Sequence, residues 1–193
     1  MLYILGGVPR VGKTIIAQAF LERTHIPFLS LDLFKMALVK GLPQAGVDPN
    51  DASDVVAKQI WPAVRGLCTT ILENKRDHLI EGDSILPVHA SHLSATFPGQ
   101  VRACFLGIER ANPANRLATI REHPGPEDWL SEYDDDEVLR MIDEMIEFSS
   151  VLRSQAEESG FPYLESRGEY GAFRERVLKF LVTGDLEGND RAP

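Results

Sequence analysis

Short, continuously apolar runs alternate along this chain with longer segments in which apolar residues recur at helical spacing. Apolar runs of this length are typical of strands that are buried on both faces. The predicted strands are residues 2–5, 26–31, 78–80, 101–107 and 161–164. The predicted helices are residues 13–22, 33–39, 52–73, 86–95, 109–122, 138–158 and 170–181. This alternation predicts right-handed βαβ crossovers and an α/β fold with helices on both faces of a parallel sheet.

Helix boundaries and interruptions follow from a few residues. Pro62 is expected to kink or split the long helix over 52–73, and Pro113 to interrupt the helix over 109–122. The acidic run Asp134–Asp136 is expected to supply an N-cap, because carboxylates favour a helix N-terminus. Gly160 is expected to cap the end of the helix that follows.

The stretch from Gly7 to Thr14 has the P-loop spacing: glycine, four residues, then Gly-Lys-Thr, between a predicted strand and a predicted helix. Glycines let backbone amides turn inward to form an anion-binding nest, and the helix N-terminus adds partial positive charge. Lys13 can reach the β- and γ-phosphates of a nucleotide, and the Thr14 hydroxyl can ligate Mg²⁺. The residues expected to bind the nucleotide are Gly7, Val8, Pro9, Arg10, Val11, Gly12, Lys13, Thr14 and Ile15.

Ligands of parallel α/β sheets bind beyond the carboxyl ends of the strands, so the residues after each strand are candidates for chemistry. Asp32 follows the second predicted strand and could accept the proton of an attacking hydroxyl; alternatively it only caps the next helix. Glu81 and Asp83 follow the third strand. We expect Asp83 to hold Mg²⁺ with Thr14 and Glu81 to lie near substrate or metal, the alternative being a cap or a loop ion pair.

Arginines follow the last two strands. Arg116 and Arg121 are expected to close over the γ-phosphate from a lid spanning about residues 110–136, although a solvated helix face is the simpler alternative. Arg167 follows the fifth strand and is expected to stack on adenine. Lys35 and Arg65 are weaker candidates for gripping an anionic acceptor.

Two further patterns do not support other site types. Asn74–Asp77 matches the guanine-recognition pattern, but it precedes a strand rather than following one, which is the wrong order for a GTPase. His89 and His92 are three apart on a predicted helix, without the third ligand that a metal site would need.

The length of 193 residues predicts one domain over residues 1–183, and the polar composition of residues 184–193 predicts a disordered tail. The formal net charge is −9. An acidic surface repels nucleic acid and anionic membranes, so we expect neither as a partner. Cys68 and Cys104 lack metal-ligand spacing and suit a reducing compartment. Without a leader or a long apolar segment, a cytoplasmic location is expected.

Residues 7–14, 30–35 and 79–87 together resemble the small-molecule kinases of the P-loop superfamily, particularly the 2-phosphoglycerate-kinase-like branch. Chloramphenicol phosphotransferases and zeta toxins resemble the chain more distantly. The resemblance implies a three-layer fold with five parallel strands in the order 2-3-1-4-5, ATP and Mg²⁺, and transfer of the γ-phosphoryl group to a small acceptor. The chain departs from the branch at Pro9-Arg10, where small residues are usual, and at Asp83.

The leading hypothesis is therefore an ATP-dependent kinase that phosphorylates a hydroxyl of a small metabolite, with Lys13, Asp32, Arg116 and Arg121 as its catalytic residues. One alternative is a nucleotide-binding switch protein that hydrolyses ATP slowly. Another is a toxin-like kinase that acts on a sugar nucleotide. The sequence identifies neither the acceptor nor the oligomeric state.

Overall fold

Five parallel strands form the centre of the molecule. The computed structural model describes residues 1–124 and 129–186. The strands are β1 (Leu2–Gly7), β2 (Phe28–Ser30), β3 (His78–Gly82), β4 (Val101–Gly107) and β5 (Tyr163–Glu165). They are ordered β2-β3-β1-β4-β5, as the resemblance implied, and every neighbouring pair is parallel. The carboxyl ends of all five strands therefore point to one edge of the sheet.

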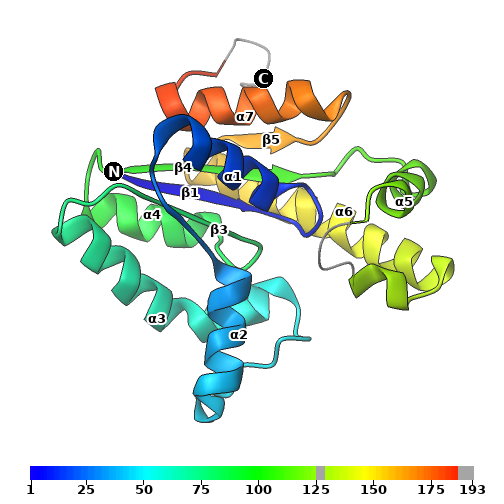
Figure 1. Ribbon diagram of the computed structural model, residues 1–193, viewed down its shortest axis with the longest axis horizontal. Helices are drawn as coiled ribbons and strands as arrows, with labels where there is room; N and C mark the ends of the chain where they lie inside the picture. Colours follow the sequence, from blue (N-terminus) through cyan, green and yellow to red (C-terminus); the bar gives the residue numbers. More distant parts are fainter. Residues whose placement is uncertain (125–128, 187–193) are drawn as a thin grey trace.

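Helices cover both faces of this sheet (Figure 1). The helices are α1 (Lys13–Thr24), α2 (Leu31–Gly41), α3 (Ser53–Glu73), α4 (Pro87–Thr96), α5 (Pro113–Glu122), α6 (Asp135–Glu158) and α7 (Tyr170–Thr183), with short 3-10 turns η1 (Pro43–Ala45) and η2 (Trp129–Glu132). One core packs α1 and α7 against the sheet, and the other packs α3, α4 and the end of α6 against the opposite face. The strands supply both cores because their successive side chains alternate between the two faces.

The lid end of the molecule lies beyond the carboxyl edge of the sheet, where α5 and the beginning of α6 stand to the right of the strands in Figure 1. A small separate core joins these elements through Ile120, Leu130, Val138 and Ile142. Residues 125–128 of the predicted lid, and residues 187–193 of the predicted tail, lie outside the described residues. The lid and tail boundaries therefore stay predictions.

Several predicted boundaries are shifted. Pro62 does not split α3, which runs without interruption, and the side chain of Pro62 is exposed. Pro113 does not lie within a helix but begins one: α5 starts there, where a proline's missing N–H costs nothing, and the Asn112 side chain caps it. The predicted N-cap of α6 is confirmed, since Asp134 accepts the Glu137 N–H while Glu137 accepts the Asp134 N–H.

Gly160 follows α6 in the left-handed conformation, as predicted for a glycine at this place. Within the described part of the chain, no helix is both long and apolar enough to cross a membrane.

His89 is a buried polar residue of the core between α3 and α4. Its ring stacks on Trp61 with centroids 4.1 Å apart, and its Nδ1 accepts the Leu86 N–H at 3.2 Å. Burial, helped by the charge of His92, lowers the pKa of His89 to about 4. The ring is therefore neutral and structural at neutral pH, with one nitrogen already used to cap α4.

This lowered pKa predicts a loss of stability in acid. Because the folded pKa lies below the unfolded value of about 6.5, the unfolded chain binds more protons between the two, and stability falls as pH falls through that window. The contribution of His89 is about 3 kcal/mol between pH 7 and pH 4. In urea unfolding measured across this range, His89→Gln should flatten the acid-side decline, whereas His92→Gln, at an exposed position, should keep most of it.

Candidate functional site

The loop between β1 and α1 is anchored by two valines and turns its backbone toward the carboxyl edge of the sheet. Val8 and Val11 are buried, and the Val8 N–H donates to the Leu106 carbonyl of β4 at 3.0 Å. Gly7 has a φ of 144°, and a Cβ there would collide with the Leu106 backbone. Arg10 and Gly12 have left-handed φ values of 63° and 84°, whereas Val11 between them does not. Alternating handedness of this kind turns successive amides inward and makes an anion-binding concavity.

Lys13 begins α1 and is nearly buried, with only 7% of its surface exposed. Its Nζ donates to the Val8 carbonyl at 2.8 Å, so the side chain lies along the loop that precedes it. A bound polyphosphate needs hydrogen-bond donors and positive charge, and the loop amides and the Lys13 ammonium group provide both. The geometry of Lys13 and its loop therefore fits a nucleotide phosphate.

The hydroxyl of Thr14 donates to Oε1 of Glu81 at 3.1 Å. Glu81 is only 1% exposed, and the neighbouring Ser30 of β2 also donates to it. Burial raises the pKa of Glu81, while the nearby charge of Lys13 and the two hydroxyl donors oppose this rise. Glu81 is thus the acid that the structure brings to Thr14.

Asp83, the other acid of this segment, has different partners. Its two carboxylate oxygens accept hydrogen bonds from Ser53 at 3.0 Å and from Ser84 at 2.9 Å. Ser53 is the first residue of α3, so Asp83 holds that helix to the end of β3. The sequence offered no signal for Ser53, because it lies thirty positions away in an unremarkable polar segment.

Asp32 lies in the first turn of α2, because this helix begins at Leu31 and not after Asp32. Ser30 occupies the N-cap position, so Asp32 is not the N-cap residue. Its side chain is 56% exposed and pairs with Lys35 at 3.2 Å. Asp32 lies two residues beyond Ser30, which is paired with Glu81 in the sheet, and its charge contributes to the raised pKa of Glu81. Asp32 is therefore an accessible carboxylate beside the phosphate loop.

Arg116 reaches from α5 to the phosphate loop, where its Nη2 donates to the carbonyl of Arg10. Burial and the adjacent charge of Arg10 lower the pKa of Arg116. Its Nε is buried without a hydrogen-bond partner among the described residues. Arg116 is thus a cation held at the edge of the loop, with a donor still to be satisfied.

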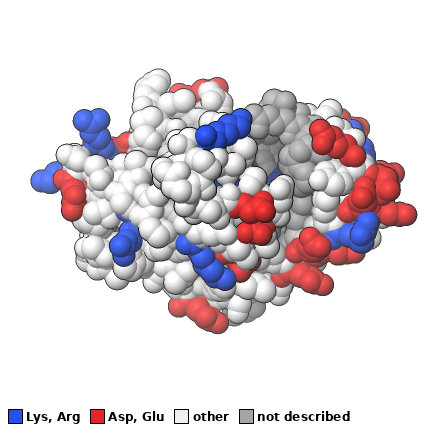
Figure 2. All heavy atoms as spheres, turned by 90° about the horizontal axis from the view of Figure 1, so that it is seen from below, with Lys and Arg blue, Asp and Glu red and all other residues white. Residues whose placement is uncertain are grey.

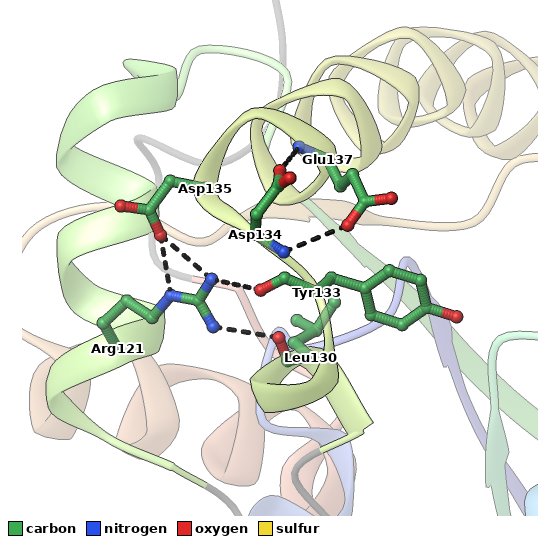
Figure 3. A network of polar contacts seen from close by, with 6 residues as sticks. All are labelled: Arg121, Leu130, Tyr133, Asp134, Asp135 and Glu137. Carbon is green, nitrogen blue, oxygen red and sulfur yellow. Dashed lines mark hydrogen bonds and ion pairs between the residues drawn. The ribbon is translucent and has the colours of Figure 1, made fainter.

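Arg121 lies on the same helix but contacts the lid itself (Figure 3). Its guanidinium binds Asp135 with its Nε and Nη2 at 3.0 and 2.9 Å, and also donates to the carbonyls of Leu130 and Tyr133. The structure therefore brings Arg116, but not Arg121, to the phosphate loop. Five positions along a regular helix separate the directions of the two side chains.

Charge is distributed unevenly over the lid end. Figure 2 shows acidic side chains gathered at the right-hand end of the face seen from below, which is the lid end of Figure 1. The exposed acids of this part, among the described residues, are Glu122, Glu132, Asp134, Asp135, Asp136, Asp143, Glu144 and Glu147. Three cations lie in or against the phosphate loop instead: Arg10, Lys13 and Arg116. Positive charge is therefore concentrated where a phosphate would bind.

The remaining predicted candidates are Arg167 and Arg65, and neither forms a hydrogen bond or ion pair with the phosphate loop among the described residues. Arg167 is exposed in the turn after β5. Arg65 is exposed on α3, about 18 Å along the helix from Ser53, which does not favour a role at the sheet edge. Tyr170, which the sequence analysis did not single out, donates its hydroxyl to the Gly12 carbonyl at 3.2 Å. It joins α7 to the phosphate loop.

The donor set suits Mg²⁺ held together with a nucleotide. Among the described residues, no group of three or more His, Cys, Asp or Glu side chains could hold a metal ion by itself. Mg²⁺ in phosphoryl-transfer sites uses one or two protein oxygens, with water and phosphate oxygens supplying the rest. The Thr14 hydroxyl and the Glu81 carboxylate fit that requirement.

No family model matches the chain, and no curated protein matches its sequence. Solved structures do match its fold. A shikimate kinase from Bacteroides thetaiotaomicron is 16% identical with a TM-score of 0.59, over 94% of this chain and 98% of that chain. A gluconokinase from Sinorhizobium meliloti 1021 is 14% identical with a TM-score of 0.59, over 93% and 90%. A sugar kinase from Janibacter sp. HTCC2649 is 18% identical with a TM-score of 0.56, over 94% of each. The chain shares the fold of these proteins, a parallel sheet in the order β2-β3-β1-β4-β5 with helices on both faces.

The Arg121 network predicts how the lid is held together. Arg121→Gln removes the fork that joins the end of α5 to η2 and the start of α6, so amide exchange over residues 113–122 and 130–138 should become faster. Hydrogen exchange with mass spectrometry measures this. Arg140→Gln is the matched control, because Arg140 donates to the Asp136 carbonyl within α6 and does not join that helix to another described segment. Equal exchange in wild type and Arg121→Gln would contradict the role of Arg121 in the lid.

Proposed function

We propose that this protein is an ATP- and Mg²⁺-dependent phosphotransferase that moves the γ-phosphoryl group to a hydroxyl of a small metabolite. The observation that carries the proposal is a buried lysine and a hydroxyl–carboxylate pair at one loop, with an accessible carboxylate just beyond the end of β2. These are the buried Lys13, the Thr14–Glu81 pair and the accessible carboxylate of Asp32. Binding alone needs the first two of these, whereas transfer to an acceptor also needs a carboxylate in reach of its hydroxyl.

The phosphates would be held by the loop amides from Gly7 to Thr14 and by Lys13. Thr14 and Glu81 would hold Mg²⁺, with Asp83 as the second candidate acid of the same segment. The ion would neutralise charge on the phosphate oxygens and help to orient them. Lys13 would leave the Val8 carbonyl to bind phosphate, which exchanges one hydrogen bond for a stronger charge-assisted one.

Asp32 would orient the acceptor hydroxyl and accept its proton as the oxygen attacks the γ-phosphorus. The new bond joins the hydroxyl oxygen to phosphorus, and the bond from phosphorus to the β–γ bridging oxygen breaks, releasing ADP. Arg116 would approach the transferring group from the lid, whose closure excludes water and so favours transfer over hydrolysis. Arg121 would act by shaping that lid, and Arg167 would lie against the adenine.

The structural neighbours support the acceptor class and not its identity. Those named as shikimate kinase, gluconokinase and sugar kinase share the fold at 14–18% identity. They support a hydroxyl-bearing small molecule as the acceptor. The resemblance to the 2-phosphoglycerate-kinase-like branch stays a prediction within this proposal, as does a toxin-like kinase acting on a sugar nucleotide.

Release of ADP by the purified protein against a panel of small hydroxyl-bearing metabolites tests the proposal. We expect release that depends on both Mg²⁺ and one class of acceptor, with a phosphorylated product visible by ³¹P NMR. Release of ADP and inorganic phosphate at the same rate with and without every acceptor would instead indicate a nucleotide-binding switch protein.

Asp32→Asn should lower acceptor-dependent turnover by about 10²–10⁴-fold, because the amide cannot accept the hydroxyl proton. ADP affinity should change little, since the proposal assigns Asp32 to the acceptor and not to the nucleotide. Asp54→Asn is the matched control: it removes a half-exposed acid that also pairs with a lysine on a helix, and turnover should be retained. Full turnover in Asp32→Asn would remove this residue from the chemistry.

A further inference from the structure

Arg10 adopts a backbone conformation that costs an arginine free energy. Its φ of 63° lies in the left-handed region, which a Cβ disfavours and glycine tolerates. The other non-glycine residues with positive φ in the described chain are His25 and Lys75, just beyond the ends of α1 and α3. Left-handed residues are common at such helix ends. Arg10 lies instead inside the phosphate loop, so its side chain needs another explanation.

Arg10 is also where the loop and the lid meet. Its carbonyl accepts the Nη2 of Arg116, from the middle of α5. Its own Nη2 approaches the carbonyl of His123, at the end of α5, at 3.4 Å. Both the backbone and the side chain of one loop residue therefore contact the lid helix.

These contacts place the two arginines close enough for the charge of one to act on the other. The charge of Arg10 disfavours the charged form of Arg116, which is already partly desolvated. Arg116 forms no ion pair with any carboxylate of the described residues, and its buried Nε lacks a hydrogen-bond partner among them. An anion bound between the two groups would remove the repulsion and could satisfy that donor.

We propose that Arg10 and Arg116 form a two-arginine site for a phosphoryl oxyanion, and that occupancy of this site docks the lid on the phosphate loop. The proposal rests on the proposed function, since the anion is taken to be a nucleotide phosphate. It assigns the unfavourable backbone of Arg10 a role: the left-handed conformation places a cation at the edge of the loop, where a glycine would leave none. Lid position is thereby coupled to whether phosphate is bound.

Two substitutions separate the side chain from the backbone. Arg10→Gly and Arg10→Ala both remove the guanidinium, but only glycine relieves the left-handed conformation. Without ligand, we expect Arg10→Gly to unfold at a temperature at or above wild type and Arg10→Ala below it. Both should bind ADP about tenfold more weakly, the amount expected for one charge-assisted contact, and Arg10→Lys should recover part of the loss.

Lid docking is measured by hydrogen exchange over residues 113–123 with and without ADP, and with pyrophosphate as a second probe. In wild type either ligand should slow exchange there, and in both Arg10→Gly and Arg10→Ala most of this slowing should be lost. Lys75→Gly is the matched control, because it relieves a left-handed cationic residue at the opposite edge of the sheet. It should leave ADP affinity and lid exchange as in wild type.

The outcomes distinguish this inference from the proposed function. If Arg10→Gly binds ADP as tightly as wild type and still slows lid exchange, the two-arginine site is wrong, whatever acceptor the enzyme uses. If wild type shows the ligand-dependent slowing and Arg10→Gly loses it, the site is supported even when no acceptor in the panel is phosphorylated. A wild type that binds neither ADP nor pyrophosphate would overturn both.

Discussion

The site depends on two opposite charges that are both withdrawn from water. Lys13 at the start of α1 and Glu81 in β3 are 7% and 1% exposed. Each would be costly to bury alone, and the charge of Lys13 opposes the rise that burial causes in the pKa of Glu81. The hydroxyls of Thr14 and Ser30 donate to the same carboxylate. These buried groups, together with Thr14 and Ser30, hold β2, β3 and the start of α1 to one another where the phosphate loop ends.

The surrounding elements divide the remaining tasks. Asp83 anchors α3 through Ser53, Tyr170 anchors α7 to the loop, and α2 presents Asp32 at an accessible position. The two predicted lid arginines also differ in their contacts, since Arg116 reaches the loop and Arg121 organises the lid. One helix thus supplies both the arginine that contacts the phosphate loop and the arginine that holds the lid segments together.

Local patterns predicted what is local. The five strands, the helices between them and the phosphate loop follow from apolar runs and one spacing motif, and the resemblance supplied the strand order. The partner of Thr14 could not be predicted from such patterns, because Glu81 and Asp83 look equivalent in the sequence. They differ in the fold, since Glu81 lies within β3 and Asp83 lies beyond its end. Arg116 and Arg121 look equally suited to phosphate for the same reason. Tyr170 and Gly12 are 158 positions apart in the sequence, so only the folded structure reveals their contact.

The strand order also determines when the site can form as the chain is synthesised. β1 is made first, yet its neighbours in the sheet are β3 and β4, so Leu2 pairs with His78 and Val101. The hydrogen bond from the Val8 amide to the Leu106 carbonyl likewise cannot form until β4 has been synthesised. Until about half of the protein has left the ribosome, this apolar strand has no partner on either side and is exposed to aggregation. A nascent chain truncated before β4 should therefore depend on chaperones and bind no nucleotide.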